Sequence, residues 1–262
     1  MKYSAGFIGT GNMGSALATA VYRTKKDIVF FDTNFEKAQI LLENLEQADI
    51  ADIDTIAKNA KFIFLAVKPN VILKVAAGLK GKISKSTTVV TMAAGVTLKE
   101  ICNAAGTDNV IRIMPNTPAA VGEGMILYCT AKVSEKTEKE FIEIMSGAGI
   151  IDKLPEKNFD AAAALSGCGP AFVYMFAQSL ADGAVACGVP REKAALYAAQ
   201  TIFGSAQMLK QSGKQPEILK EEVCSPGGTT IAGVASLEEA AFRSAVADAV
   251  TASFKKTAEL KK

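Results

Sequence analysis

A glycine-rich turn near the N-terminus constrains the fold of this chain more than any other feature. The apolar segment 3–8 runs directly into Gly9, Gly11 and Gly14, which have the spacing G-x-G-x-x-G, and the small-residue run 15–20 follows. Such an order is typical of a strand, a tight turn and a helix that packs closely on a sheet. The chain is therefore predicted to begin with a βαβ unit.

Short apolar segments alternate with helical patterns from Tyr3 to about Lys153. The expected strands cover residues 3–8, 28–32, 61–66, 87–92 and 109–114. Two helix starts are expected between them, because Thr33 with Glu36 and Thr97 with Glu100 have the spacing of capping boxes. The alternation predicts an α/β fold, with a Rossmann-type doubly wound parallel sheet covered on both faces, over residues 1–157.

The strand pattern fades after about Asn158, and the sequence becomes alanine-rich with helical periodicity. Residues 158–262 are therefore predicted to form an all-helical C-terminal dimerisation and substrate-binding domain. One helix is expected to begin at Pro190 and to be capped by Gly213, and the pair Ser236 and Glu239 is expected to open the last helix. The large apolar helix surface predicts a homodimer, with a compact monomeric bundle as the alternative.

One uncharged segment, residues 161–181, is long enough to span a bilayer. Gly167, Gly169 and Pro170 interrupt it, so we expect a buried helix and no membrane association. Met1 and Lys2 lead straight into the first apolar strand without the pattern of a signal peptide. A cytoplasmic protein is expected.

The charge and the metal-binding residue types exclude several function classes. The formal net charge is +2, from 29 basic and 27 acidic residues, so no strong field favours nucleic acid as a partner. The chain has no histidine, and its five cysteines are dispersed. We therefore expect neither a metal site nor a disulfide framework.

The glycine turn predicts a dinucleotide site, because glycine lets a pyrophosphate approach the backbone N–H groups at a helix N-terminus. Asp32 ends the second expected strand about 20 residues after Gly11, where an acid binds the adenosine ribose. A carboxylate there repels a 2′-phosphate, and only Lys37 is near enough in sequence to neutralise one. We therefore expect NADH or NADPH as the cofactor, and Asp32 favours NADH.

Later expected strands end at motifs containing prolines, at the sheet edge where ligands bind in doubly wound folds. Simple strand termination is the alternative function of these prolines. The predicted cofactor-binding residues are Ile8, Gly9, Thr10, Gly11, Asn12, Met13, Gly14, Asp32, Ala66, Val67, Lys68, Pro69, Met114, Pro115 and Asn116.

A second glycine turn, at Gly227 and Gly228, precedes another expected helix and offers N–H groups to a small anion such as a carboxylate. From the sequence alone, an ordinary helix-entry turn with a threonine cap is an equal alternative. This turn belongs to one of five motifs that resemble those of pyrroline-5-carboxylate reductases. They are residues 9–14 (GTGNMG), 66–69 (AVKP), 114–118 (MPNTP), 166–171 (SGCGPA) and 225–230 (SPGGTT).

The resemblance spans nearly the whole chain, and its last two motifs are specific to the family. It implies an oxidoreductase that transfers a hydride from NAD(P)H to the C=N bond of L-1-pyrroline-5-carboxylate, giving L-proline in the last step of proline biosynthesis. It also implies a homodimer, sometimes assembled into a decamer, and a catalytic Thr230. The implied substrate-binding residues are Ser225, Gly227, Gly228, Thr229 and Thr230. Cys168 and Phe172 depart from the family pattern of serine and tyrosine, which leaves any hydrogen bond of those hydroxyls in question.

The absence of histidine agrees with reduction of an imine. A protonated imine is accessible in neutral water, whereas reduction of a ketone needs an acid for the developing alkoxide. A β-hydroxyacid dehydrogenase would need a catalytic lysine, and residues 167–186 contain none. A reductase of another cyclic imine or ketimine carboxylate, and a non-catalytic redox sensor that binds a dinucleotide, are the remaining alternatives.

Overall fold

A computed structural model describes residues 1–259 as two compact units. The first unit contains residues 1–168 and the end of the last helix from Ser253, and the second contains residues 169–252. The first unit thus extends beyond the predicted boundary at 157/158, because the helix that follows this boundary packs on the sheet through the fully buried Phe159. Residues 260–262 of the predicted second domain lie outside the described residues.

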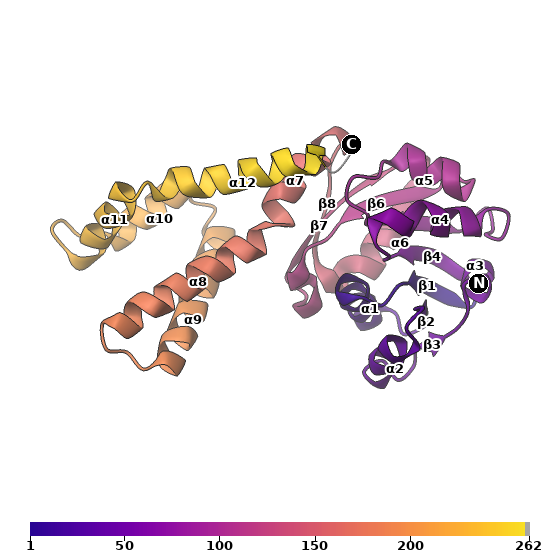
Figure 1. Cartoon of the computed structure of the whole chain (residues 1–262), viewed down its shortest axis with the longest axis horizontal. Helices are drawn as coiled ribbons and strands as arrows, with labels where there is room; N and C mark the ends of the chain where they lie inside the picture. Colours follow the sequence, from indigo (N-terminus) through magenta and orange to yellow (C-terminus); the bar gives the residue numbers. More distant parts are fainter. Residues whose placement is uncertain (260–262) are drawn as a thin grey trace. The chain divides into compact units, whose positions relative to one another are not determined.

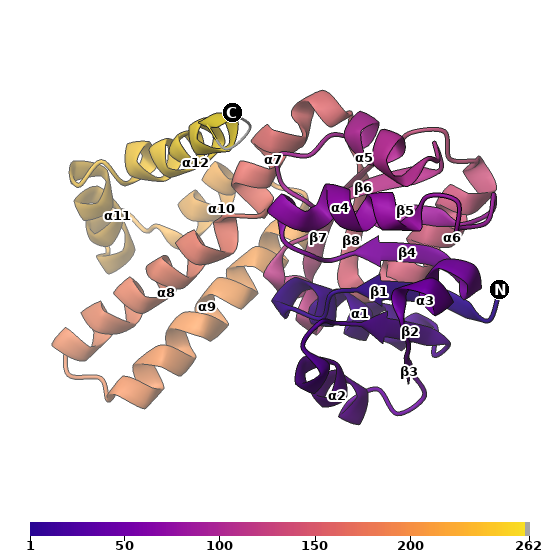
Figure 2. The same ribbon diagram turned by 45° about the vertical axis from the view of Figure 1, so that its right-hand side comes forward.

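The first unit is built on one eight-stranded sheet with the order β3-β2-β1-β4-β5-β6-β7-β8, which can be followed in Figures 1 and 2. Its strands are β1 (Tyr3–Ile8), β2 (Ile28–Phe31), β3 (Asp49–Ile50), β4 (Ala60–Leu65), β5 (Thr88–Thr91), β6 (Val110–Met114), β7 (Gly124–Thr130) and β8 (Gly149–Lys153). The six strands from β3 to β6 are parallel, as predicted, and have the doubly wound order of a dinucleotide-binding fold.

Helices cover both faces of this sheet, and the strands alternate their side chains between two apolar cores. The helices of the first unit are α1 (Asn12–Thr24), α2 (Phe35–Glu43), α3 (Ile53–Asn59), α4 (Pro69–Leu79), α5 (Leu98–Ala105), α6 (Glu135–Met145) and α7 (Phe159–Ser166), with short 3-10 turns η1 (Thr117–Val121), η2 (Ser146–Ala148) and η3 (Glu156–Asn158). Phe62 and Phe64 of β4 pack with α1, α2 and α6, whereas Ile63 and Leu65 pack with α3, α4, α5 and Phe159. Because both faces of the sheet are covered, side chains of either orientation are buried, which explains the continuous apolar runs in the sequence.

Three strands were missing from the sequence prediction. β3 has only two residues, and β7 and β8 extend the sheet beyond β6. β7 runs antiparallel to β6, with Ile113 opposite Tyr128, so the sheet is mostly rather than wholly parallel. Short strands and strands added at an edge take their structure from pairing, which leaves little local signal.

One of the two predicted capping boxes is present. The Thr97 hydroxyl accepts the N–H of Glu100, and the Glu100 carboxylate accepts the N–H of Thr97, at the start of α5. The prediction for Thr33 and Glu36 was wrong by one residue, because the Asn34 side chain caps α2. An asparagine caps a helix as well as a threonine does, so the pattern was ambiguous.

The second unit is helical, as predicted. It contains α8 (Gly169–Ala186), α9 (Arg191–Ser212), α10 (Pro216–Val223) and α11 (Thr229–Glu239), together with most of α12 (Phe242–Glu259). Helices α8 and α9 lie side by side (Figure 1). The buried residues Ala181, Ala194 and Ala198 form one small apolar cluster of these helices. Pro190 is the residue before α9, and Gly213 caps its end with φ +65°.

The prediction that Ser236 and Glu239 open the last helix was wrong. Both residues lie inside α11, which continues from Thr229, and the last helix begins at Phe242. The break comes at Ala240 and Ala241, where Ala241 has φ +55°. Nothing in the sequence marks this alanine as a turn residue, since glycine or asparagine is usual at positive φ.

The apolar segment Glu156–Ala186 is long and apolar enough to cross a membrane by the criteria of length and composition. In the structure it is divided, because α7 ends at Ser166 and α8 begins at Gly169. Only 11% of its most apolar window is buried within the chain. A large apolar surface of the second unit is thus left uncovered by the chain itself.

Candidate functional site

The glycine turn lies at the carboxyl edge of the sheet, where several strands end at the same level. Ile8, the last residue of β1, is paired with Phe31 of β2 and with Leu65 of β4. The segments that follow these three strands therefore meet at one place. Gly9 has φ +104°, and a Cβ on it would lie 2.5 Å from the Ala66 carbonyl oxygen, so only glycine fits there.

The other two glycines of the motif have different functions. A Cβ on Gly14 would collide with the Gly9 carbonyl and lie 3.0 Å from the Ala66 side chain, so this glycine lets α1 approach the strand ends. A Cβ on Gly11 would meet no atom within 4 Å. Gly11 is the N-cap of α1 and offers no side chain to its N–H groups. No side chain at the N-cap therefore occupies these N–H groups, and the space beside Gly11 is open, which is compatible with the predicted pyrophosphate site.

Asp32 is tied to the glycine turn. Its Oδ2 accepts the backbone N–H of Thr10 at 2.7 Å and the Thr10 hydroxyl at 3.0 Å, and its Oδ1 accepts the N–H of Asn34 at 2.8 Å. Partial burial alone would raise the pKa of the Asp32 carboxyl, but these hydrogen bonds outweigh it and hold the pKa below its usual value. The carboxylate therefore stays charged beside the turn and fixes its shape.

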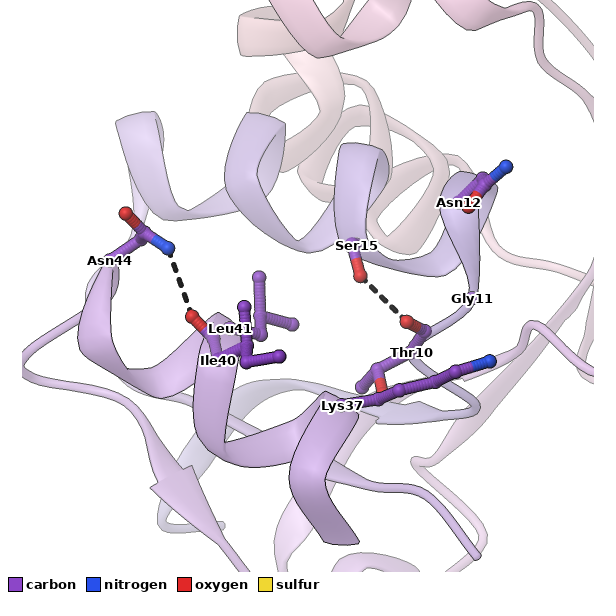
Figure 3. A pocket seen from close by; sticks show the side chains of 8 residues that line it. All are labelled: Thr10, Gly11, Asn12, Ser15, Lys37, Ile40, Leu41 and Asn44. Carbon is purple, nitrogen blue, oxygen red and sulfur yellow. Dashed lines mark hydrogen bonds between the residues drawn. The ribbon is translucent and has the colours of Figure 1, made fainter. Parts of the chain in front are cut away.

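A pocket of about 320 Å³ opens beside the turn, between α1 and α2 (Figure 3). It is lined by Thr10, Gly11, Asn12, Ser15, Lys37, Ile40, Leu41 and Asn44. The Lys37 side chain extends along the pocket toward the glycine turn. Ser15 donates its hydroxyl to the Thr10 carbonyl at 2.8 Å, which further rigidifies the turn. Lys37 was already noted beside Asp32 in the sequence, whereas Ile40, Leu41 and Asn44 were missed, although they follow Lys37 at helical spacing.

The motif 66–69 lies against the glycine turn. The Ala66 N–H donates to the Ile8 carbonyl at 2.9 Å, and Lys68 and Pro69 begin α4 without a side-chain cap. The place of this motif is compatible with cofactor binding and also with the alternative of simple strand termination, since Pro69 fixes the start of α4. The assignment of these residues to the cofactor stays a prediction.

Asn116, which follows β6, has a structural function in the first unit. Its side chain donates to the Ser166 carbonyl at 3.0 Å and accepts the Met125 N–H at 2.9 Å, and only 9% of the residue is exposed. It thereby holds the end of α7 against β7. Neither it nor its neighbours Met114 and Pro115 line the pocket at the glycine turn.

The second predicted anion site lies at the start of α11. Gly228 is its N-cap and provides no side chain to the first-turn N–H groups, and Gly227 has φ +65°. The Gly228 N–H donates to the Ser225 carbonyl at 3.1 Å, and a Cβ on Gly228 would collide with the Ser225 hydroxyl. The half-buried Thr230 follows in the first turn. The geometry again leaves helix N–H groups open to an anion.

Comparisons with known proteins agree with both halves of this description. A family model described as pyrroline-5-carboxylate reductase dimerisation matches residues 156–260, and one described as NADP oxidoreductase, coenzyme F420-dependent, matches residues 4–95. The pyrroline-5-carboxylate reductase of Arabidopsis thaliana is 37% identical over 99% of this chain and 96% of its own length. That of Escherichia coli is 37% identical over the whole of both chains.

The chain belongs to the pyrroline-5-carboxylate reductase family. A crystal structure of the Plasmodium falciparum pyrroline carboxylate reductase with NADP bound superposes with a TM-score of 0.86 at 33% identity, over the whole of both chains. The predicted family, fold class and function, NAD(P)H-dependent reduction of pyrroline-5-carboxylate in proline biosynthesis, are thereby confirmed. Among residues 1–259, no group of three or more acidic or cysteine side chains is placed to hold a metal ion.

Proposed function

We propose that the turn at Gly11 binds the cofactor pyrophosphate, that the α11 N-terminus binds the substrate carboxylate, and that Thr230 is the catalytic residue. The observation that supports this assignment is common to both turns. Helices α1 and α11 each begin at a glycine whose absent side chain leaves the first-turn N–H groups unbonded. Both N-termini therefore suit an anionic group.

The substrate end is formed by the predicted residues Ser225, Gly227, Gly228, Thr229 and Thr230. The Ser225 carbonyl holds the Gly228 N–H, which shapes the turn and leaves the N–H groups of Thr229 and Thr230 to the carboxylate. A carboxylate that accepts hydrogen bonds from two N–H groups is held in one orientation, and the ring attached to it is therefore oriented as well.

When bound, NAD(P)H supplies the hydride that adds to the ring carbon of the C=N bond. The π electrons of that bond then remain on the ring nitrogen, which already carries its proton. The Thr230 hydroxyl, in the first turn beside the carboxylate grip, binds this nitrogen and holds the ring for attack. No imidazole acid is needed, in agreement with a chain that contains no histidine.

Replacement of Thr230 tests this assignment. Thr230→Ala should lower kcat by roughly 10- to 100-fold, the value of one hydrogen bond to a charged group, while the Kd for the cofactor changes by less than about twofold. Thr230→Ser retains the hydroxyl and is the matched control. A Thr230→Ala enzyme with normal kcat, or one that loses only cofactor affinity, would remove Thr230 from the catalytic step.

We propose that both cofactors are accepted and that Asp32 favours NADH. Its charged carboxylate lies beside the turn that begins the pocket, where a 2′-phosphate would be repelled. Lys37, which lines the same pocket, offsets part of that repulsion. The ratio of kcat/KM for NADH to that for NADPH should fall in Asp32→Asn and rise in Lys37→Gln. A wild-type ratio below one would contradict the preference for NADH.

We propose that the oligomer implied by the dimerisation domain is a homodimer formed through the second unit. Its helices expose large apolar side chains, with Tyr174 62% and Met175 72% exposed on α8 and Leu196 59% exposed on α9. An apolar surface of this kind is stable in water only when another molecule covers it. Met175→Asp should give monomers in light scattering, whereas Lys210→Asp, at the end of α9, should not. Assembly into a decamer and a cytoplasmic location stay predictions, which light scattering of the wild type and cell fractionation test.

Two alternatives to this function were open from the sequence. A reductase of a six-membered cyclic imine carboxylate would use the same turns, and comparison of kcat/KM on five- and six-membered rings separates the two. A non-catalytic redox sensor is disfavoured by membership of an enzyme family. Oxidation of NADH that depends on pyrroline-5-carboxylate is the assay for the proposed reaction.

A further inference from the structure

A second pocket in the first unit has no part in the proposed reaction. It is open and has a volume of about 380 Å³, within the range of small-molecule sites. Its lining is Lys61, Lys85, Ser86, Asn109, Lys132, Ser134, Lys136, Thr137 and Glu140. Four lysines thus surround one cavity that contains a single carboxylate.

The pocket lies at the edge of the sheet opposite to the glycine turn. Lys61 is at the start of β4, and Ser86 and Asn109 precede β5 and β6, whereas the glycine turn follows the end of β1. These strands are parallel, and a six-residue strand such as β1 is about 20 Å long. The lysines therefore do not belong to the cofactor site.

The charges of the pocket are only partly compensated. Lys61 pairs with Glu140 at 2.5 Å, and Lys132 pairs with Asp108 at 2.7 Å. Lys85 and Lys136 have no ion pair with any described residue. The chain therefore leaves two ammonium groups of this pocket without a compensating carboxylate.

Neutral hydrogen-bond donors complete the lining. The first turn of α6 contributes the side chains of Lys136 and Thr137, while the Ser134 hydroxyl already accepts the Thr137 N–H. The Asn109 side chain donates one N–H to the Thr87 carbonyl at 2.9 Å and has a second N–H to offer. The hydroxyls of Ser86, Ser134 and Thr137 lie in the same lining. Phosphate oxygens accept hydrogen bonds of both kinds, from ammonium and from neutral groups.

We propose that this pocket binds a small polyanion, namely the diphosphate group of a phosphorylated metabolite, through Lys85 and Lys136. A diphosphate suits the pocket better than a single carboxylate does, because two uncompensated ammonium groups need at least two negative charges. The site is separate from the turn that holds the cofactor pyrophosphate, and it gives the enzyme a second place at which phosphate compounds act.

Inorganic pyrophosphate is the probe, titrated by calorimetry at low ionic strength into the full chain saturated with NADP⁺. The bound NADP⁺ occupies the glycine turn, so any remaining pyrophosphate site lies elsewhere. We expect saturable binding of one pyrophosphate per chain, weakening as salt is added. Sulfate, with two charges on one centre, should bind more weakly.

The variant Lys85→Gln with Lys136→Gln should weaken pyrophosphate binding by about tenfold for each lysine removed. The control, Lys74→Gln with Lys99→Gln, removes the same charge from exposed positions of α4 and α5 outside this pocket. Both variants should oxidise NADH with wild-type kcat/KM in the absence of pyrophosphate, which also shows that they fold.

Pyrophosphate should raise the thermal midpoint of the NADP⁺-saturated wild type and of the control, but not that of the pocket variant. The proposal is overturned by the absence of saturable binding with NADP⁺ present. It is equally overturned if the pocket variant and the control bind pyrophosphate alike. Neither result bears on the cofactor and substrate assignments, which the Thr230 and Asp32 variants test.

Discussion

Gly11 and Gly14 lie three positions apart in one motif, yet the structure predicts opposite consequences when each is replaced by alanine. A Cβ on Gly11 meets nothing within 4 Å, whereas a Cβ on Gly14 collides with the Gly9 carbonyl and approaches the Ala66 side chain to 3.0 Å. Gly11→Ala should therefore affect the ligand, and Gly14→Ala should affect the fold.

The magnitudes follow from these contacts. The collision in Gly14→Ala involves backbone, which cannot move aside as a side chain can, so the free energy of unfolding should fall by about 1–3 kcal/mol. The Gly11 backbone has φ −67° and ψ −178°, which alanine adopts readily, so the free energy of unfolding should change by no more than about 0.5 kcal/mol. The new methyl group of Gly11→Ala instead enters the space expected for the pyrophosphate and should raise the cofactor Kd at least about tenfold.

Two measurements on each variant separate these effects. Urea unfolding without cofactor gives the change in the free energy of unfolding, and calorimetric titration with NADH gives the Kd. For the chain without ligand, Gly14→Ala should be the only one of the two that is clearly destabilised. The reasoning is refuted if Gly11→Ala is destabilised as much as Gly14→Ala, or if Gly11→Ala binds NADH as tightly as the wild type.

Three further predictions concern buried polar groups of the first unit. The Arg112 side chain is 2% exposed; it pairs at 2.9 Å with Glu156, which is 34% exposed, and lies 3.7 Å from Asp160. Because Asp160 still offsets part of the Arg112 charge, Glu156→Ala should lower the free energy of unfolding by about 1–3 kcal/mol in urea unfolding. Arg112→Met should lower it less, because the partly exposed Glu156 can be hydrated. Burial raises the pKa of the Cys129 thiol to about 12, so this thiol ionises at a lower pH in the unfolded chain than in the folded one. The free energy of unfolding should therefore fall as the pH rises from about 8.5 toward 12, and this fall should be smaller in Cys129→Ala. Asn116→Ala removes two hydrogen bonds at a buried site and should lower the free energy of unfolding by about 2 kcal/mol, whereas Asn44→Ala, at the exposed end of α2, should change it little.

The sequence predicted the parallel half of the sheet well because those strands carry their own signal. Residues 62–65 are apolar at every position, as a strand buried on both faces requires. β7 and β8 carry a weaker signal, since Met125 is half-buried and Ile150 is exposed. Their place depends on pairing with β6 and with each other, which a local pattern does not contain.

In the candidate site, too, features with a local sequence signal could be predicted, and features that depend on strand pairing could not. The three glycines could be predicted from their local spacing: Gly9 and Gly14 answer steric needs of the turn, and Gly11 leaves space for a ligand. The hydrogen bonds from Thr10 to Asp32 could not, because they join the ends of two strands and depend on the register between Ile8 and Phe31. The pocket residues Ile40 and Leu41 of α2 follow from the same register, which brings α2 beside the turn.

The N-termini of the two proposed site helices differ from those of several other helices in how their first-turn N–H groups are satisfied. Helices α3, α5 and α6 begin at Asp52, Thr97 and Ser134, whose side chains accept a first-turn N–H. Such a cap stabilises a helix by about 1 kcal/mol. Helices α1 and α11 begin at Gly11 and Gly228 and forgo that cap.

A serine at either glycine would satisfy the first-turn N–H groups internally and compete with the ligand for them. The missing cap is therefore a condition for binding, and its cost is recovered only when an anion arrives. It follows that the cofactor should stabilise α1 and the substrate carboxylate should stabilise α11, each locally. Slower amide exchange in residues 12–15 with NADH, and in residues 229–232 with substrate, is the expected signature.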